Sequence, residues 1–221
     1  MIIAPQFIPL WLNLLVGTGM LVCIATAVWF APWSSVQAAT NRQHVLLGGL
    51  LALLLLWLLS FEVTEGVSIH LLGVTSLTLI IGWRLTIAGG TLVLIALFWF
   101  EQHSMSSAPL AWFFSLMVPA SVTRLLVFVL RRHGFRNLFV YMLGAGFGGG
   151  LLSMLAAAAL TLPVFWLIGQ SDWLTAGLEH WPFVLLLMFP EGFINGMVIT
   201  AFTVFYPDVV KTFDDDFYLS E

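Results

Sequence analysis

His70 and Glu191 are ionisable side chains that lie inside long apolar stretches of the sequence. An imidazole can bind a borderline divalent metal ion, whereas a carboxylate in an apolar segment needs a partner because burial of its charge is costly. Two interpretations stay open for each residue. His70 is a metal ligand or a hydrogen-bonded packing histidine. Glu191 supports a site or is a structural carboxyl, protonated or capped by backbone groups around Pro190, Gly192 and Gly196.

The sequence lacks residues that several other kinds of site would need. The only lysine, Lys211, follows the last apolar stretch, so a retinal Schiff base inside a membrane is excluded. The single cysteine, Cys23, excludes a disulfide framework and a cysteine-rich metal cluster. The sequence contains no G-x-x-x-x-G-K-[ST] loop, so we expect no ATP hydrolysis by that route and no enzyme activity. A haem protein stays a weak alternative, because only His70 is clearly inside a span.

The composition indicates that the solvent of these residues is lipid. Hydrophobic residues make up 61% of the 221 residues, charged residues only 8%, and the mean hydropathy is +1.04. A soluble domain of this size needs far more polar surface, with about 25% charged residues on average. The formal net charge of -4 offers no basic surface for nucleic acid, so we expect the lipid bilayer as a partner and no nucleic acid.

The apolar stretches predict an all-α, polytopic membrane protein with about seven helices. A span needs about 17 to 25 apolar residues. We expect one transmembrane domain over residues 1–221, with a short acidic cytoplasmic tail at 207–221. Glycines between 144 and 150 predict close helix contact or a local break in the sixth span. The predicted spans are 7–30, 45–60, 67–83, 85–100, 109–130, 138–168 and 182–206.

The basic residues predict the orientation of these spans. Every second loop contains Lys or Arg, and the loops between them contain only acidic charges. Since basic loops face the cytoplasm, we expect the N-terminus outside and the C-terminus in the cytoplasm. The membrane is expected to be the inner membrane of the cell. The basic residues outside the spans are Arg42, Arg84, Arg131, Arg132, Arg136 and Lys211, and Arg124 lies within a span near its basic end.

Two segments resemble a known transporter family. Residues 65–73, EGVSIHLLG, are similar to the S-V-H-L-L-G segment of the CbiM/NikM family, and residues 191–201, EGFINGMVITA, are similar to its E-G-L-x-T-A pattern in the last helix. The resemblance covers roughly residues 60–206. That family comprises the membrane substrate-binding components of energy-coupling-factor transporters for cobalt and nickel.

The resemblance implies a function and a set of site residues. A divalent metal ion, cobalt, nickel or another, would be the substrate, and no prosthetic group is implied. His70 and the N-terminal amine of Met1 correspond to family metal ligands, whereas position 2, a histidine in the family, is Ile2 here. The substrate pocket or its surroundings would include Glu65, Ser68, Glu191 and Asn195, although Glu65 could also simply complement a helix dipole.

The partners implied are a membrane coupling subunit and cytoplasmic ATPase subunits, which would supply the energy. The alternative is a non-transporting membrane scaffold or assembly protein that keeps the fold without the metal site. If Glu191 supports the metal site, its replacement by Gln should fold normally and fail in uptake.

Overall fold

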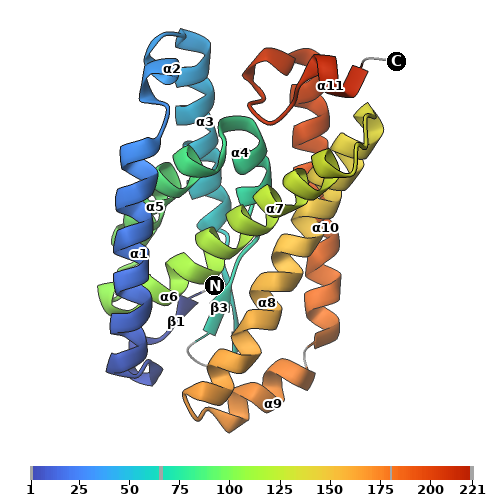
Figure 1. Cartoon of the computed structure of the whole chain (residues 1–221). Helices are drawn as coiled ribbons and strands as arrows, with labels where there is room; N and C mark the ends of the chain where they lie inside the picture. The colour runs from blue at the N-terminus through green and yellow to red at the C-terminus, as the bar shows by residue number, and fades with distance from the viewer. Residues whose placement is uncertain (1, 65–66, 180, 220–221) are drawn as a thin grey trace.

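Long apolar helices form most of the chain, as the composition predicts. The computed structural model describes residues 2–64, 67–179 and 181–219, and Figure 1 shows the helices as a bundle of tilted rods. The helices are α1 (Leu10–Phe30), α2 (Trp33–Gln37), α3 (Thr40–Trp57), α4 (Val74–Ile81), α5 (Trp83–Phe100), α6 (Ala108–Trp112), α7 (Val118–Arg132), α8 (Gly149–Leu167), α9 (Ser171–Glu179), α10 (Trp181–Phe205) and α11 (Asp215–Leu219).

Shorter helical pieces join or extend these helices. The 3₁₀ turns are η1 (Pro5–Phe7), η2 (Met105–Ser107) and η5 (Pro207–Val209). Two π-helical segments, η3 (Phe113–Met117) and η4 (Val140–Gly148), lead directly into α7 and α8. Because a π-helical turn shifts the side chains that follow it, such segments often occur at functional sites.

Among the residues that the structure describes, five helical stretches are long and apolar enough to cross a membrane. They coincide with the first, fourth, fifth, sixth and seventh predicted spans, so the expectation of an all-α, multi-pass membrane protein is confirmed. The helices α3 and α4 correspond to the other two predicted spans, and the count of seven stays a prediction. The five stretches are Leu10–Phe30, Trp83–Phe100, Met105–Arg132, Val140–Leu167 and Trp181–Phe205.

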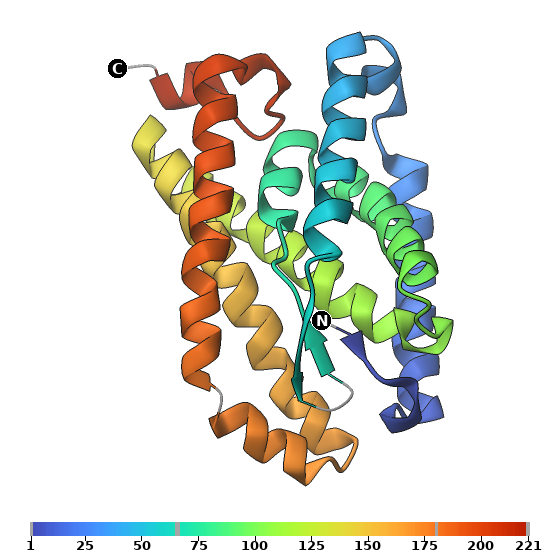
Figure 2. The same ribbon diagram turned by 180° about the vertical axis from the view of Figure 1, so that it is seen from behind.

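The third predicted span, 67–83, is wrong as a continuous helix. Its first residues form the strand β3 (Val67–Ile69), which lies between β1 (Ile2–Ile3) and β2 (Phe61–Thr64) in a small antiparallel sheet with the order β1-β3-β2. Figure 2 shows the long, narrow β2–β3 ribbon running between the helices. An apolar run alone cannot reveal this sheet, because the partner β1 lies far away in the sequence.

Two glycines limit α4 to eight residues. Gly73 has a φ of 64° just before the helix, and Gly82 has a φ of 86° between α4 and α5. Residues with side chains rarely adopt this backbone conformation, so glycine permits both sharp changes of direction. The predicted third span is therefore a strand, a loop and a short helix.

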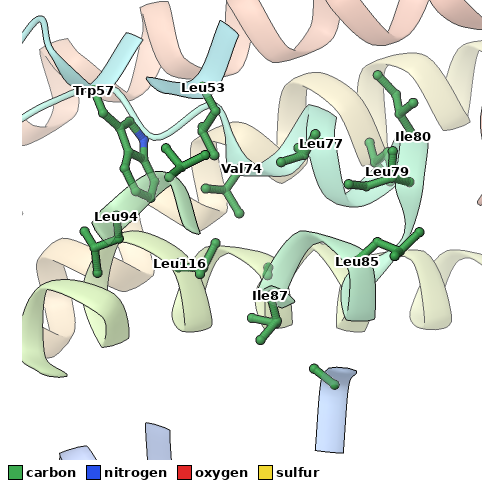
Figure 3. Packing of buried hydrophobic residues seen from close by; sticks show 14 of the residues in the cluster. Leu53, Trp57, Val74, Leu77, Leu79, Ile80, Leu85, Ile87, Leu94 and Leu116 are labelled. Atoms are coloured by element: carbon green, nitrogen blue, oxygen red, sulfur yellow. The ribbon is translucent and has the colours of Figure 1, made fainter. Parts of the chain in front are cut away.

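All eight residues of α4 are buried among longer helices. Figure 3 shows how Val74 and Leu77 of α4 meet Leu53 and Trp57 of α3 and Leu116 of η3. Because every side of α4 is covered by protein, the partners of its polar groups lie within the bundle, and the buried hydroxyl of Thr78 has none among the described residues.

Glycines bring α8 and the preceding segment η4 into close contact with α10. A Cβ atom on Gly150 would lie 2.9 Å from the carbonyl oxygen of Glu191, and one on Gly146 would lie 3.2 Å from Cβ of Ile199. The close helix contact predicted from the glycine-rich stretch 144–150 is confirmed. It fixes the position of the α10 residues that face the centre of the bundle.

The basic residues of several loops gather at one end of the molecule, beside the acidic C-terminal tail. The Nη2 atom of Arg131 donates a hydrogen bond to the carbonyl of Thr212 at 2.7 Å, and Arg42 and Arg84 lie close enough to Lys211 to lower the pKa of its ammonium, after the larger effect of its partial burial. In Figure 1 this end contains α2 and the C-terminal segment. The predicted grouping of these basic residues is confirmed, while the side of the membrane they face stays a prediction.

Candidate functional site

Glu191 is buried in the bundle and holds the chain that leads into α4. Its side chain belongs to α10 and is 1% exposed. Oε2 accepts a hydrogen bond from the backbone N–H of Leu72 at 2.7 Å, and Oε1 accepts one from the N–H of Gly73 at 2.9 Å. The carboxyl is thus capped by backbone groups, but these belong to the segment two and three residues after His70 and not to the residues around Pro190, Gly192 and Gly196, as the sequence suggested.

Asn195, one turn further along α10, completes this cap. Its Nδ2 donates to Oε1 of Glu191 at 2.7 Å, and its Oδ1 accepts from both the backbone N–H and the hydroxyl of Ser76, each at 2.7 Å. The first N–H groups of a helix have no partner within that helix. Two side chains of α10 therefore supply the N-terminal cap of α4.

A cluster of hydroxyl groups holds α4 on a second side. Thr75 Oγ1 lies 3.0 Å from Thr123 Oγ1 of α7 and 3.1 Å from Ser153 Oγ of α8. Thr123 and Ser153 also donate to the carbonyl of Pro119 at 2.9 and 3.2 Å. All three hydroxyl side chains are buried. Since each has hydrogen-bond partners, the cluster fixes α4 relative to α7 and α8.

His70 lies in the loop between β3 and α4, not on a helix as the sequence predicted, and is 2% exposed. Its Nδ1 atom is 2.9 Å from the carbonyl oxygen of Leu71 and must therefore be the protonated nitrogen. This leaves Nε2 as the nitrogen with the lone pair, and Nε2 lies 3.2 Å from the hydroxyl of Ser115. A carbonyl that fixes Nδ1–H in this way is a common support of metal-binding histidines.

Trp57 and Ser115 complete the surroundings of His70, and sequence reasoning missed both. The indole ring of Trp57 contacts the imidazole with 5.1 Å between centroids, and its Nε1 donates to the carbonyl of Leu72 at 2.8 Å. Ser115 is on the π-helical segment η3. A tryptophan in an apolar run that needs a partner for its N–H was an available signal, whereas nothing in the sequence distinguishes Ser115.

Ser68, another predicted site residue, lies in the strand before His70. The backbone of Ser68 lies in β3, opposite Ile2 on one side and Glu62 on the other. The sheet thus places Ile2 opposite Ser68, two residues before His70. Met1 and Glu65 lie outside the described residues, so their predicted roles stay predictions.

These contacts define what the site can do chemically. Both carboxylate oxygens of Glu191 accept N–H groups of the segment that follows His70, so Glu191 positions the His70 loop. Within residues 2–64, 67–179 and 181–219, no group of three or more His, Cys, Asp or Glu side chains is arranged to hold a metal ion. A metal ion at His70 would therefore take its other ligands from elsewhere, such as backbone nitrogens or water.

Comparison with known proteins adds a family match. A family model described as the cobalt uptake substrate-specific transmembrane region matches residues 3–209. No curated protein and no solved structure matches the chain. The matched range includes every described residue of the site around His70 and Glu191.

Proposed function

Because the chain belongs to the CbiM family, we propose that it captures a divalent transition-metal ion at His70 and passes it to partner subunits for transport. The family itself makes the protein a multi-pass membrane component of cobalt uptake. In the proposed system, a membrane coupling subunit and cytoplasmic ATPase subunits of the energy-coupling-factor type supply the energy, in a cell inner membrane.

One observation supports the assignment of His70 more than any other. The hydrogen bond from Nδ1–H to Leu71 directs the lone pair of Nε2 towards Ser115, and the loop that carries His70 is fixed by Glu191 and Trp57. A ligand held in one orientation loses little conformational freedom when it binds a metal ion. Glu191 and Asn195 then act by positioning, and Ser68, Glu65 and the amine of Met1 stay proposed members of the pocket.

Metal titration of the purified protein tests this proposal. We expect wild type to bind Co²⁺ or Ni²⁺, measured by calorimetry and elemental analysis. His70→Ala should weaken binding at least about tenfold, or about 1.4 kcal/mol, because it removes an imidazole ligand. His44→Ala is the matched control, since it removes an exposed imidazole on α3, two residues after Arg42. Unchanged affinity of His70→Ala with a lower melting temperature would contradict the proposal.

A scaffold that lacks the metal site is the second candidate. The observation that favours it is that the described residues hold no cluster of side-chain metal ligands around His70. The same titration decides between the two functions. A folded wild-type protein that binds neither ion would support the scaffold, and binding that depends on His70 would exclude it.

A further inference from the structure

A cavity lies at the end of the molecule where the basic residues gather. It is next to the C-terminal end of α4, whereas His70 precedes the N-terminal end of this helix. Its volume is about 480 Å³, and it is lined by residues before and within α3, by the end of α4, and by the segment that follows α10. The lining has two chemically different parts. Val36, Leu46 and Ile81 are apolar, whereas Arg42 and Lys211 are basic.

The two basic side chains are available to a ligand. Both are exposed, and within the described part of the chain neither forms a salt bridge with a carboxylate, although the carboxylate of Asp208 also lines the cavity. The methylene groups of Lys211 pack over Gly82, whose added Cβ would lie 2.9 Å from Cδ of the lysine. The absence of a side chain at Gly82 thus lets Lys211 lie across the turn between α4 and α5.

Three basic groups at this end repel one another. Partial burial, together with the charges of Arg42 and Arg84, lowers the pKa of the Lys211 ammonium from its ordinary value. Arg84 donates to the carbonyl of Phe30 at 3.1 Å and so stays at the same end. An anion bound among these groups would relieve this repulsion.

The position of the cavity relative to the bilayer identifies the kind of anion. Trp29 and Trp33, which are 82% and 40% exposed, flank Pro32 of the cavity wall. Exposed tryptophans mark the level of the lipid headgroups. A ligand here therefore meets basic groups at headgroup level and an apolar wall beside them, which matches a phospholipid better than a free phosphate ion.

We propose that this cavity binds the phosphate headgroup of an anionic phospholipid. Arg42 and Lys211 contact the phosphate, and the first methylene groups of an acyl chain lie against Leu46 and Ile81. Basic pockets between membrane helices recognise anionic headgroups by charge and hydrogen bonds. The inference does not depend on the metal site, because no residue is shared between them.

Lipid titration of the purified full-length protein tests the proposal. We expect phosphatidylglycerol, added to the detergent, to raise the melting temperature and to stay bound in native mass spectrometry. Arg42→Gln and Lys211→Gln should each raise the half-saturating lipid concentration at least tenfold, and Lys211→Arg should retain binding because arginine also donates to phosphate. Arg132→Gln is the matched control, because it removes one exposed charge outside the cavity lining.

Four results would overturn the proposal. Equal weakening by Arg132→Gln would mean a general charge effect. Equal binding of phosphatidylcholine would remove the preference for an anionic lipid, and saturation by inorganic phosphate at the same concentration would identify a free-phosphate site. Unchanged binding in both folded glutamine variants would remove the site itself. If one glutamine variant does not fold, the other still provides the comparison.

Discussion

Glu191 is a membrane-embedded carboxyl whose partners are mainly backbone amides of another segment. The sequence identified it as a residue that needs a partner, but Leu72 and Gly73 lie 119 and 118 positions away. Backbone N–H groups exist at nearly every position, so no residue type reveals which of them a carboxylate contacts. The cap was therefore outside the reach of sequence reasoning, although Glu191 itself was not.

Replacement of Glu191 by Gln should lower both stability and metal affinity. The amide has one acceptor oxygen, so its NH₂ group would face the N–H of Leu72 or Gly73, and one buried donor would lose its partner. We expect a loss of about 1 to 3 kcal/mol in the free energy of unfolding. The sequence alone predicted normal folding with loss of uptake, and the contacts add the loss of stability.

Thermal unfolding and metal titration check this expectation. Glu179→Gln, an exposed change on α9, is the control and should behave as wild type. A Glu191→Gln protein with wild-type melting temperature and wild-type metal affinity would show that the carboxylate is not needed as a cap.

At the scale of elements, the contact between α8 and α10 decides where Glu191 and Asn195 lie. A Cβ on Gly150 would be 2.9 Å from the carbonyl oxygen of Glu191 and from Cα of Gly192, both backbone atoms. Backbone atoms cannot rotate away as a side chain can, so the two helices must separate to accept even one methyl group.

We therefore expect Gly150→Ala to destabilise the protein by about 1 to 3 kcal/mol. Gly19→Ala is the control, because a Cβ on Gly19 of α1 meets nothing within 4 Å. In a helix, alanine is favoured over glycine, so the control should keep or raise the melting temperature. Equal melting temperatures for wild type and Gly150→Ala, measured in the same detergent, would contradict this account of helix packing.

The elements differ in how well the sequence predicts them. Long apolar helices such as α1, α5 and α10 were found because length and apolarity are sufficient to identify a helix that spans lipid. The stretch 67–83 was also apolar, but its first residues pair with β1 and β2. Its short helix, α4, is capped at the N-terminus by side chains of α10. Apolarity reports burial, not the backbone partner, so strand and loop were misread as helix.

The residues of the candidate site also differ in how well the sequence predicts them. His70, Glu191 and Asn195 were expected near the pocket. In the structure, Glu191 of α10 contacts the loop that carries His70, and Asn195 contacts Glu191 and the start of α4. Ser115 reaches His70 only through the π-helical turn of η3, a shift of register that a regular helical pattern does not show. Trp57 was one tryptophan among ten, and its burial depends on tertiary packing.

For the whole molecule, the uneven distribution of charge predicts the orientation in the membrane. Reporter fusions after Arg42, Arg84 and Arg136 should report cytoplasm, because these residues lie in the basic loops. Fusions at Glu65, Ser106 and Asp172 should report the outside. Alkaline phosphatase and fluorescent-protein fusions measure the two sides independently, and one loop found reproducibly on the wrong side would contradict the count of seven spans.

The distant cap on α4 also has a consequence for biogenesis. The amides of Leu72, Gly73 and Ser76 are made more than a hundred residues before Glu191 and Asn195 leave the ribosome. Until α10 enters the membrane, these amides lack their native acceptors, and an unsatisfied backbone group in lipid costs several kcal/mol. The loop that carries His70 therefore reaches its final form only after α10 has inserted, long after the residues of the loop itself have been synthesised.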